Sequence, residues 1–408
     1  EIYQERRDDL KVDVVVHEGD VDDSIKNKFI RPFSLSEGPL FRFEIYNSSN
    51  GTSLLSDFHH IILDGTSLNI FFNDVAKIYD GREVEDEKYN GFDLSLEELA
   101  IEKSEIYSQA KKYFNQKIKS FDSSTILSPD LNGKEEDGHL GEQLISLDKL
   151  KVEKFCKDNA ITPNNLFLAA TIFTLSKFVY NKDILISTIS NGRSNPQFQN
   201  SLAMMVKTLP IALNINSNIT AAEYFSYIEN IWLDVLKYEC YPFTKISNEY
   251  DMFPEFLYAY HGKIIEDIII NGKYVIREHL EYEALKFKLS INIVESDKNF
   301  DIHSQYNNAL YSKDLIITFL ESIVIVINKL MEDPTILLKN ISLLHPTEIK
   351  EEFIFKPVKE QLLNKLFEKQ VKLHGDEIAL IADDGEFTYN ELNRKANNIA
   401  HSLIKHGV

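Results

Sequence analysis

Cysteine is scarce in this sequence of 408 residues: Cys156 and Cys240 are the only two, and neither belongs to a CxxC motif. The scarcity argues against a disulfide framework and against a cysteine-based zinc site. We therefore expect a protein of a reducing compartment, with the cytoplasm as the simplest interpretation.

Long apolar runs are also missing. The N-terminal segment EIYQERRDDLKVD is charged and lacks the apolar core of a signal peptide. The longest apolar stretch, Leu315 to Met331, carries Glu321 and Lys329. A membrane-spanning helix needs about 20 residues with few charges. We therefore expect a packed amphipathic helix at this stretch, and no membrane as a partner.

Positive charge is in deficit, because 64 acidic residues outnumber 44 basic ones and the formal net charge is -20. Nucleic acids are bound through Lys and Arg side chains that neutralise phosphates. We therefore expect no nucleic-acid partner. The hydrophobic share of 43% and the charged share of 26% are ordinary for a globular protein. The length predicts two or three structural units.

Helical and strand patterns alternate along most of the chain. Strand patterns cover 10–16, 40–46 and 53–60, and helical patterns cover 66–81 and 95–120. Further on, Thr162 and Pro163 have the residue types of a helix N-cap and a first helical position. This alternation continues to about residue 344 and predicts an α/β fold.

Composition also predicts the domain boundaries. Residues 123–143 are rich in Ser, Gly, Asp and Glu, so we interpret them as a connection between an N-terminal lobe, 1–122, and a C-terminal lobe, 144–344. Residues 345–361 resemble a linker, and a further unit begins at residue 362. This last unit, 362–408, is too short to bury a full core of its own.

The heptapeptide HHIILDG, His59 to Gly65, is the motif with the most chemical content, and it follows a predicted strand. A histidine at a strand end can offer a ring nitrogen for proton transfer near neutral pH. Asp64, on the following turn, is placed to form a buried salt bridge. Gly65 permits close backbone approach or a positive φ. The spacing alone favours a structural role for the histidines and leaves the functional role open.

The extended motif HHIILDGTS resembles the HHxxxDGxS active-site motif of condensation domains from nonribosomal peptide synthetases. Four other segments resemble further motifs of that family in the same order, and the tail resembles the opening of an adenylation domain. These segments are Arg31 to Ile45, Ser190 to Ser194 with Leu202 to Leu213, Tyr241 to Ile246, Ile302 to Asp314, and, for the tail, Leu366 to Val408.

The resemblance implies a two-lobed chloramphenicol-acetyltransferase-like α/β fold with a tunnel between the lobes. It implies that the domain joins an upstream carrier-bound acyl or peptidyl thioester to the amine of a downstream carrier-bound aminoacyl thioester. The partners would be two peptidyl carrier domains and the adjacent adenylation domain. Phosphopantetheine arms would carry the substrates, with no directly bound cofactor. Independently of the resemblance, His261, His303 and His345 are scattered without the spacing of metal ligands, so we expect no metal.

The resemblance also assigns the site residues. His60 would be the central residue, acting as a general base or by positioning the amine. Asp64 would be structural, Gly65 would contribute backbone near the reacting carbonyl, and His59 would support the loop. Arg193 could line the tunnel or cap a turn.

Two departures from the family pattern carry expectations. The family has a longer N-terminal region, which supplies the arginines expected to pair with Asp64. We therefore expect Asp64 to lack its partner, this chain to be less stable than an extended domain, and its activity to depend on that region. The family's RDxSRNPL-like segment is not recognisable within Asn248 to Ile265.

Several alternatives remain. A heterocyclisation domain would carry Asp in place of His59, and an epimerisation domain usually has HHxxxDxxSW, whereas Gly65 is present and no Trp follows Ser67. Of these variants, the epimerisation domain remains the weaker alternative and a starter domain with a fatty-acyl donor stays open. The alternatives outside the family are a free-standing acyltransferase and a non-catalytic platform that docks carrier domains.

Overall fold

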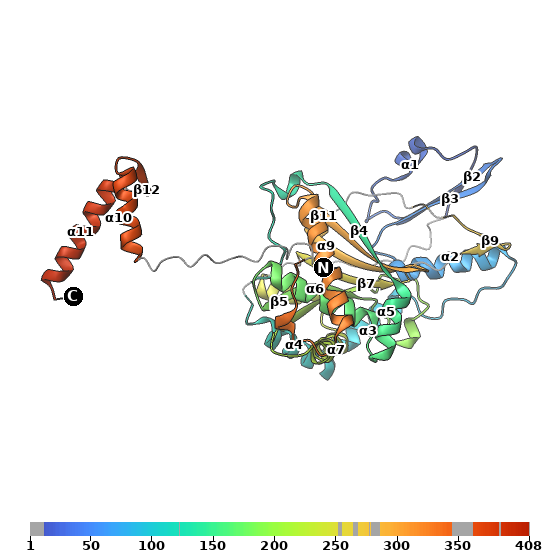
Figure 1. Cartoon of the computed structure of the whole chain (residues 1–408). Helices are drawn as coiled ribbons and strands as arrows, with labels where there is room; N and C mark the ends of the chain where they lie inside the picture. Colours follow the sequence, from blue (N-terminus) through green and yellow to red (C-terminus); the bar gives the residue numbers. More distant parts are fainter. Residues whose placement is uncertain are drawn as a thin grey trace. The chain divides into compact units, whose positions relative to one another are not determined.

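The computed structural model divides the chain into two compact units, Glu1–Leu344 and His345–Val408, which are described separately (Figure 1). The predicted linker over 345–361 lies outside the described residues. The structure describes residues 12–121, 123–251, 255–263, 268–276, 278, 286–344, 362–382 and 385–407.

The first lobe of the larger unit is built on a three-stranded sheet of β1 (Val14–Glu18), β2 (Phe41–Ser48) and β3 (Gly51–Phe58). Strand β1 runs parallel to β2, and β3 runs antiparallel to it. Helix α2 (Gly65–Tyr79) covers one face, because its Phe71 stacks on Phe43 at 5.6 Å between ring centroids. Arg42 is next to Phe43 in β2, so its side chain points to the opposite face of the sheet. There it donates to the Phe29 carbonyl at the end of helix α1 (Asp23–Phe29), 3.1 Å away.

The second lobe is built on a six-stranded mixed sheet in the order β4-β11-β10-β7-β5-β6. Strands β5, β7 and β10 are parallel to one another, and the other pairs are antiparallel. The strands are β4 (Leu140–Asp148), β5 (Asp183–Ser190), β6 (Lys207–Asn214), β7 (Phe256–Gly262), β10 (Leu289–Glu295) and β11 (Asn299–Asn307).

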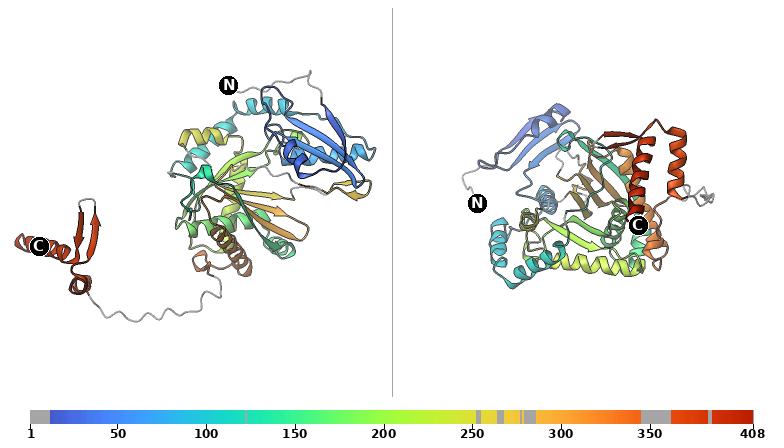
Figure 2. Two further views of the ribbon diagram at one scale, coloured as in Figure 1. Left: turned by 90° about the horizontal axis from the view of Figure 1, so that it is seen from above. Right: turned by 90° about the vertical axis from the view of Figure 1, so that its left-hand side faces the viewer.

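The helices that pack with this sheet include α5 (Lys149–Asp158), α6 (Pro163–Phe178), α7 (Ala221–Lys237), α8 (Phe243–Tyr250) and α9 (Lys313–Glu332) (Figure 2). Every residue of α6 from Asn164 to Ser176 is buried, so this helix is enclosed on all sides. Its predicted start is confirmed, since the Thr162 side chain accepts from the Asn165 N–H at 3.1 Å. Helix α9, predicted from the long apolar stretch, is a packed core helix as expected. Within the described residues, no helix combines the length and apolar character needed to span a membrane.

The single helix predicted over 95–120 is two helices, α3 (Gly91–Ile101) and α4 (Glu105–Ile118). Ser104 interrupts the pattern with an extended backbone, at φ −88° and ψ 165°. Its hydroxyl donates to the Ile101 carbonyl at 2.5 Å, which gives the backbone a local alternative to a continuous helix.

Helix α4 packs with the second lobe, although it precedes the predicted connection over 123–143. Its Ala110, Phe114 and Ile118 are buried in the same core as the six-stranded sheet. The Phe114 ring stacks on Tyr241, with 6.5 Å between the ring centroids. Helix α4 therefore shares the core of the six-stranded sheet, although it lies within the predicted N-terminal lobe, 1–122.

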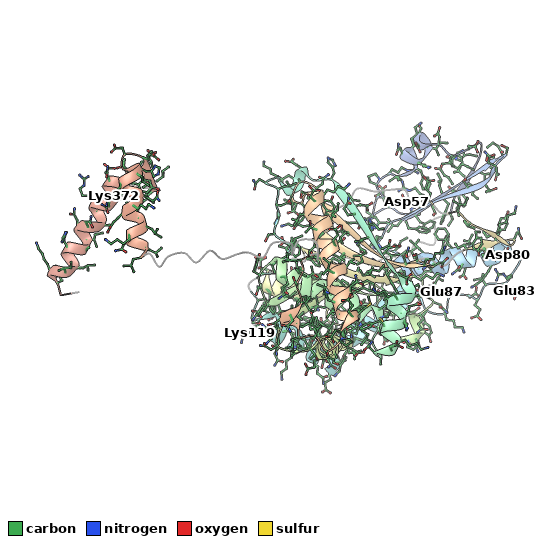
Figure 3. The ribbon with its side chains drawn as sticks, viewed as in Figure 1. Asp57, Asp80, Glu83, Glu87, Lys119 and Lys372 are labelled. Carbon is green, nitrogen blue, oxygen red and sulfur yellow. The ribbon has the colours of Figure 1, made fainter. Side chains whose placement is uncertain are left out.

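A short hairpin from the second half of the chain reaches the first lobe. It consists of β8 (Ile269–Ile270) and β9 (Lys273–Tyr274). The Asn271 N–H donates to Asp80 Oδ1 at 2.9 Å, beyond the end of α2, and Figure 3 labels Asp80 beside the hairpin. Glu278, just after the hairpin, pairs with Lys26 of α1 at 2.5 Å. The two lobes are therefore joined by a strap as well as by direct packing.

The smaller unit consists of helix α10 (Leu363–His374), the hairpin β12 (Ile378–Ala382) and β13 (Gly385–Thr388), and helix α11 (Tyr389–Lys405). Thr388 and Glu391 form a capping box at the start of α11. Of the described residues in this unit, none is buried.

Replacing Phe114 by Ala tests the placement of α4. Phe114 is 1% exposed, and truncating a buried phenylalanine costs about 3–5 kcal/mol. We expect the free energy of unfolding of the larger unit, measured by urea titration, to fall by this amount. Gln116→Ala, on the exposed side of the same helix, should change it by less than about 0.5 kcal/mol. Equal small effects of both substitutions would show that α4 does not belong to this core.

Candidate active site

The HHIILDG segment forms the turn between β3 and α2. The His59 N–H donates to the Leu40 carbonyl at 2.9 Å, which extends the strand pairing past β3. Asp64 is the N-cap of α2, and its Oδ1 accepts from the Ser67 N–H at 2.8 Å. An aspartate satisfies the unpaired first-turn N–H groups of a helix well. The motif therefore lies on a strand-turn-helix junction, as its position in the sequence predicts.

His60 is fixed by a hydrogen bond within the turn. Its Nδ1 lies 2.8 Å from the Leu63 carbonyl oxygen. A carbonyl oxygen only accepts, so Nδ1 is the donor, and in the neutral ring Nε2 keeps its lone pair. The residue as a whole is exposed. The turn therefore presents a ring nitrogen that can accept a proton or a hydrogen bond.

His59 faces a different environment. Its Nδ1 accepts from the Ile61 N–H at 3.1 Å, and its ring meets Phe33 edge-on at 6.0 Å. The Arg42 guanidinium lies over the Phe33 ring, 3.8 Å from its centroid. Arg42 also pairs with Asp57 at 3.5 Å; Asp57 is labelled in Figure 3. Burial raises the pKa of the Asp57 carboxyl, and the Arg42 charge partly offsets that rise.

Asp64 has a partner, contrary to the expectation from the sequence. Its carboxylate is buried and lies 3.1 Å from Nη2 of Arg193, in the second lobe. Its Oδ2 also accepts from the Met205 N–H at 3.0 Å. The prediction that Asp64 lacks a partner in this chain is therefore wrong. The ion pair is made between the two lobes.

Arg193 is buried and uses both ends of its guanidinium. Its Nη1 donates to the carbonyls of Phe198, Gln199 and Ser201 at 2.9, 3.0 and 2.9 Å. Its Nη2 contacts Asp64 and donates to Ser67 Oγ at 2.8 Å. The sequence offered two roles for Arg193, lining the tunnel or capping a turn, and the carbonyl contacts match the capping role. The sequence analysis did not predict the ion pair with Asp64. A nearby cation compensates the charge of a buried aspartate, and Arg193 is the only arginine in the second-lobe motifs.

Ser67 joins the two second-lobe motif segments to the HHIILDGTS motif. Its hydroxyl donates to the Ala203 carbonyl at 2.8 Å and accepts from the Ala203 N–H at 3.1 Å. Segments 190–194 and 202–206, separated in the sequence, therefore both contact the turn that carries the histidines.

The two glycines of these motifs differ. Gly65 has no positive φ, and a Cβ added to it would meet no heavy atom within 4 Å, so a positive φ is not its role. Gly192 has φ +64°, and its added Cβ would lie 1.9 Å from the Met205 carbonyl oxygen. The turn before Arg193 therefore requires glycine.

Other reactive groups lie apart from this site. Among the described residues, no group of three or more His, Cys, Asp and Glu side chains could hold a metal ion. Both cysteines are free. Burial raises the pKa of the Cys156 thiol to about 12, which makes it a poor nucleophile at neutral pH.

The Condensation domain family model matches residues 2–351. The chain therefore belongs to the Condensation domain family. Its curated relatives are peptide synthases, and the family match, together with these relatives, makes it a condensation domain of the nonribosomal peptide synthetase type.

Two relatives indicate the degree of similarity. Bacitracin synthase 2 of Bacillus licheniformis is 27% identical over 404 residues, covering 94% of this chain and 15% of that protein. Gramicidin S synthase 2 of Brevibacillus brevis is 25% identical over 411 residues, covering 94% of this chain and 9% of that protein. The chain thus spans a small part of the length of these relatives.

Solved structures share the fold. The X-domain from teicoplanin biosynthesis has a TM-score of 0.70 at 16% identity, covering 83% of each chain. The first condensation domain of the calcium-dependent antibiotic synthetase has a TM-score of 0.65 at 16% identity, covering 81% of this chain and 78% of that chain. The holo-AB3403 four-domain nonribosomal peptide synthetase has a TM-score of 0.68 at 16% identity, covering 98% of this chain and 33% of that chain. The two-lobed chloramphenicol-acetyltransferase-like α/β fold is confirmed.

Replacing Gly192 by Ala tests the turn that presents Arg193. The left-handed backbone and the contact with the Met205 carbonyl both oppose a side chain. We expect the thermal midpoint of the larger unit to fall by several degrees. Gly65→Ala is the matched control, because its added Cβ meets no neighbour, and its midpoint should stay near that of the unmodified chain. A Gly192→Ala variant as stable as the control would contradict this description of the turn.

Proposed function

We propose that this domain forms an amide bond between a donor thioester and the amine of an acceptor, each delivered on a carrier domain. The observation that carries the proposal is the fixed His60 ring, whose Nδ1 bonds to the Leu63 carbonyl so that Nε2 is available. The similarity to peptide synthases supports the substrate class.

The reaction needs few groups. The acceptor amine attacks the thioester carbonyl, a C–N bond forms, the C–S bond breaks, and the donor thiol leaves. The amine must lose one proton, which His60 Nε2 can accept and pass to the departing sulfur. The same nitrogen could instead act by accepting a hydrogen bond that orients the amine. Both roles use the same ring position.

The neighbouring residues have supporting roles in this proposal. Asp64 fixes the turn through its cap and its ion pair. Gly65 begins helix α2, and the first N–H groups of a helix lack partners within the helix. An N–H there could donate to the oxyanion that develops on the reacting carbonyl. His59, bonded back to the Ile61 N–H, supports the loop.

The substrates in this proposal arrive on phosphopantetheine arms of an upstream and a downstream peptidyl carrier domain. These arms are carriers of substrate rather than a resident cofactor. They would enter a tunnel between the two lobes, where the Asp64–Arg193 ion pair joins the lobes next to the histidines.

We further propose that residues 366–408 are the opening of an adenylation domain. The match to the Condensation domain model ends at residue 351, close to the division between the two compact units. The four-domain synthetase aligns with 98% of this chain, whereas the first condensation domain of the calcium-dependent antibiotic synthetase aligns with 81%. The exposed Leu363, Ile381 and Ile404 fit a unit whose apolar surface packs on further chain.

The proposal predicts that His60→Ala lowers amide formation strongly. Losing a general base typically reduces the rate about 10²–10⁴-fold. The measurement uses the intact synthetase module with loaded donor and acceptor carrier domains, and it follows the dipeptidyl thioester over time. His401→Ala, in the smaller unit and exposed, is the control and should retain the full rate.

Equal rates for His60→Ala and the unmodified module would remove His60 from the proposal. Binding of loaded carriers without any amide product would favour the docking platform instead. Product formation from a soluble acyl thioester without a donor carrier would favour the free-standing acyltransferase.

A further inference from the structure

The turn that carries Arg193 rests on a buried pair made by Ser190 and Glu239. Ser190 ends β5, and its hydroxyl donates to Glu239 Oε2 at 2.5 Å. The same hydroxyl accepts from the Gly192 N–H at 3.2 Å. Ser190 is 6% exposed and Glu239 is 7% exposed. The serine oxygen therefore links the Glu239 carboxylate to the backbone just before Arg193.

Glu239 occupies an unfavourable place for a carboxylate. It follows Tyr238, the C-cap of α7, where the helix dipole favours positive charge. It is also buried, and a buried carboxylate loses hydration that hydrogen bonds or an ion pair must replace. Position and burial therefore both disfavour the Glu239 carboxylate. Among the described residues, its side chain is compensated by the hydrogen bond from Ser190.

The contacts continue from Glu239 to the catalytic turn. Beyond Gly192 comes the Arg193 guanidinium, which pairs with Asp64 at 3.1 Å. Asp64 directly follows Leu63, whose carbonyl accepts from His60 Nδ1 at 2.8 Å. A continuous series of hydrogen bonds and covalent links thus runs from the second lobe to the histidine ring. In order, the residues are Glu239, Ser190, Gly192, Arg193, Asp64, Leu63 and His60.

We propose that Glu239 and Ser190 are positioning residues for His60. Their hydrogen bond fixes the Asn191–Gly192 turn, the turn aims Arg193 at Asp64, and Asp64 holds the carbonyl that selects the Nδ1–H form of His60. Glu239 acts only through this series of contacts and touches neither substrate nor reacting atoms. The predicted effect on the His60 tautomer does not depend on the proposed function. The predicted effect on the rate of amide formation rests on it.

The first measurement is the tautomer of His60, observed by NMR on the chain with ¹⁵N-labelled histidine rings. Comparison with a His60→Gln sample assigns the His60 signals. In the unmodified chain we expect one neutral form, with the proton on Nδ1. In Glu239→Ala and in Ser190→Ala, the Nδ1–H form should give way to a mixture, because the carbonyl of Leu63 is no longer held.

The second measurement is the rate of amide formation in the intact module. Glu239→Ala and Ser190→Ala should each lower kcat about tenfold, the effect of one lost hydrogen bond, with little change in KM. The double variant should be no slower than either single one, because the two residues act as one unit. Glu239→Gln keeps an acceptor oxygen for the Ser190 hydroxyl and should recover most of the rate.

Two controls separate positioning from general destabilisation. Glu229→Ala removes a carboxylate from α7, the helix that precedes Glu239, and Ile228→Val lowers stability within the buried face of α7. Neither should alter the His60 ring signals or kcat. An unchanged tautomer in Ser190→Ala, or a Glu239→Gln variant as impaired as Glu239→Ala, would overturn the proposal. A module that forms no amide, yet shows the predicted tautomer change, would refute the proposed function and leave the positioning role standing.

Discussion

The buried ion pair between Asp64 and Arg193 is the interaction on which the rest of the site depends. It joins residues 129 positions apart, from two lobes, and both side chains are almost wholly removed from solvent. Such a pair does not add stability by itself, because desolvation of the two charges opposes their attraction. Its effect is geometric. Arg193 also gathers three carbonyls of its own loop, and Asp64 also caps α2, so the pair fixes two backbone segments against each other.

This constraint explains how a short turn can present a histidine reproducibly. The His60 residue is exposed, and its ring bonds to the Leu63 carbonyl, next to Asp64 in the chain. A ring held only by its own turn would sample several orientations. Arg193 follows β5 of the six-stranded sheet and pairs with Asp64. The sheet therefore restrains the motion of the histidine turn, which contains Asp64. The strap through β8 and β9 adds a second connection between the lobes.

Local features of the fold could be predicted from the sequence, because they depend on neighbouring residues. The Thr162 cap, the packed helix near Leu315 and the strand that ends at the HHIILDG motif all belong to this class. The break at Ser104 was missed, since the apolar spacing continues across it. The pairing of Asp64 with Arg193 was not predicted. A lone arginine in a glycine turn carries no local sign of a carboxylate 129 residues away, and Glu239 likewise has no sequence feature that points to Ser190.

The most direct test of this account is a double-mutant cycle on the ion pair, with Asp64→Asn, Arg193→Met and both changes together. The free energy of unfolding is measured by urea titration of the larger unit. We predict that each single change is strongly destabilising and that the double variant is more stable than the sum implies, with a coupling of about 2–3 kcal/mol. Effects that add to within about 0.5 kcal/mol would contradict the claim that this pair holds the two lobes around the histidine turn.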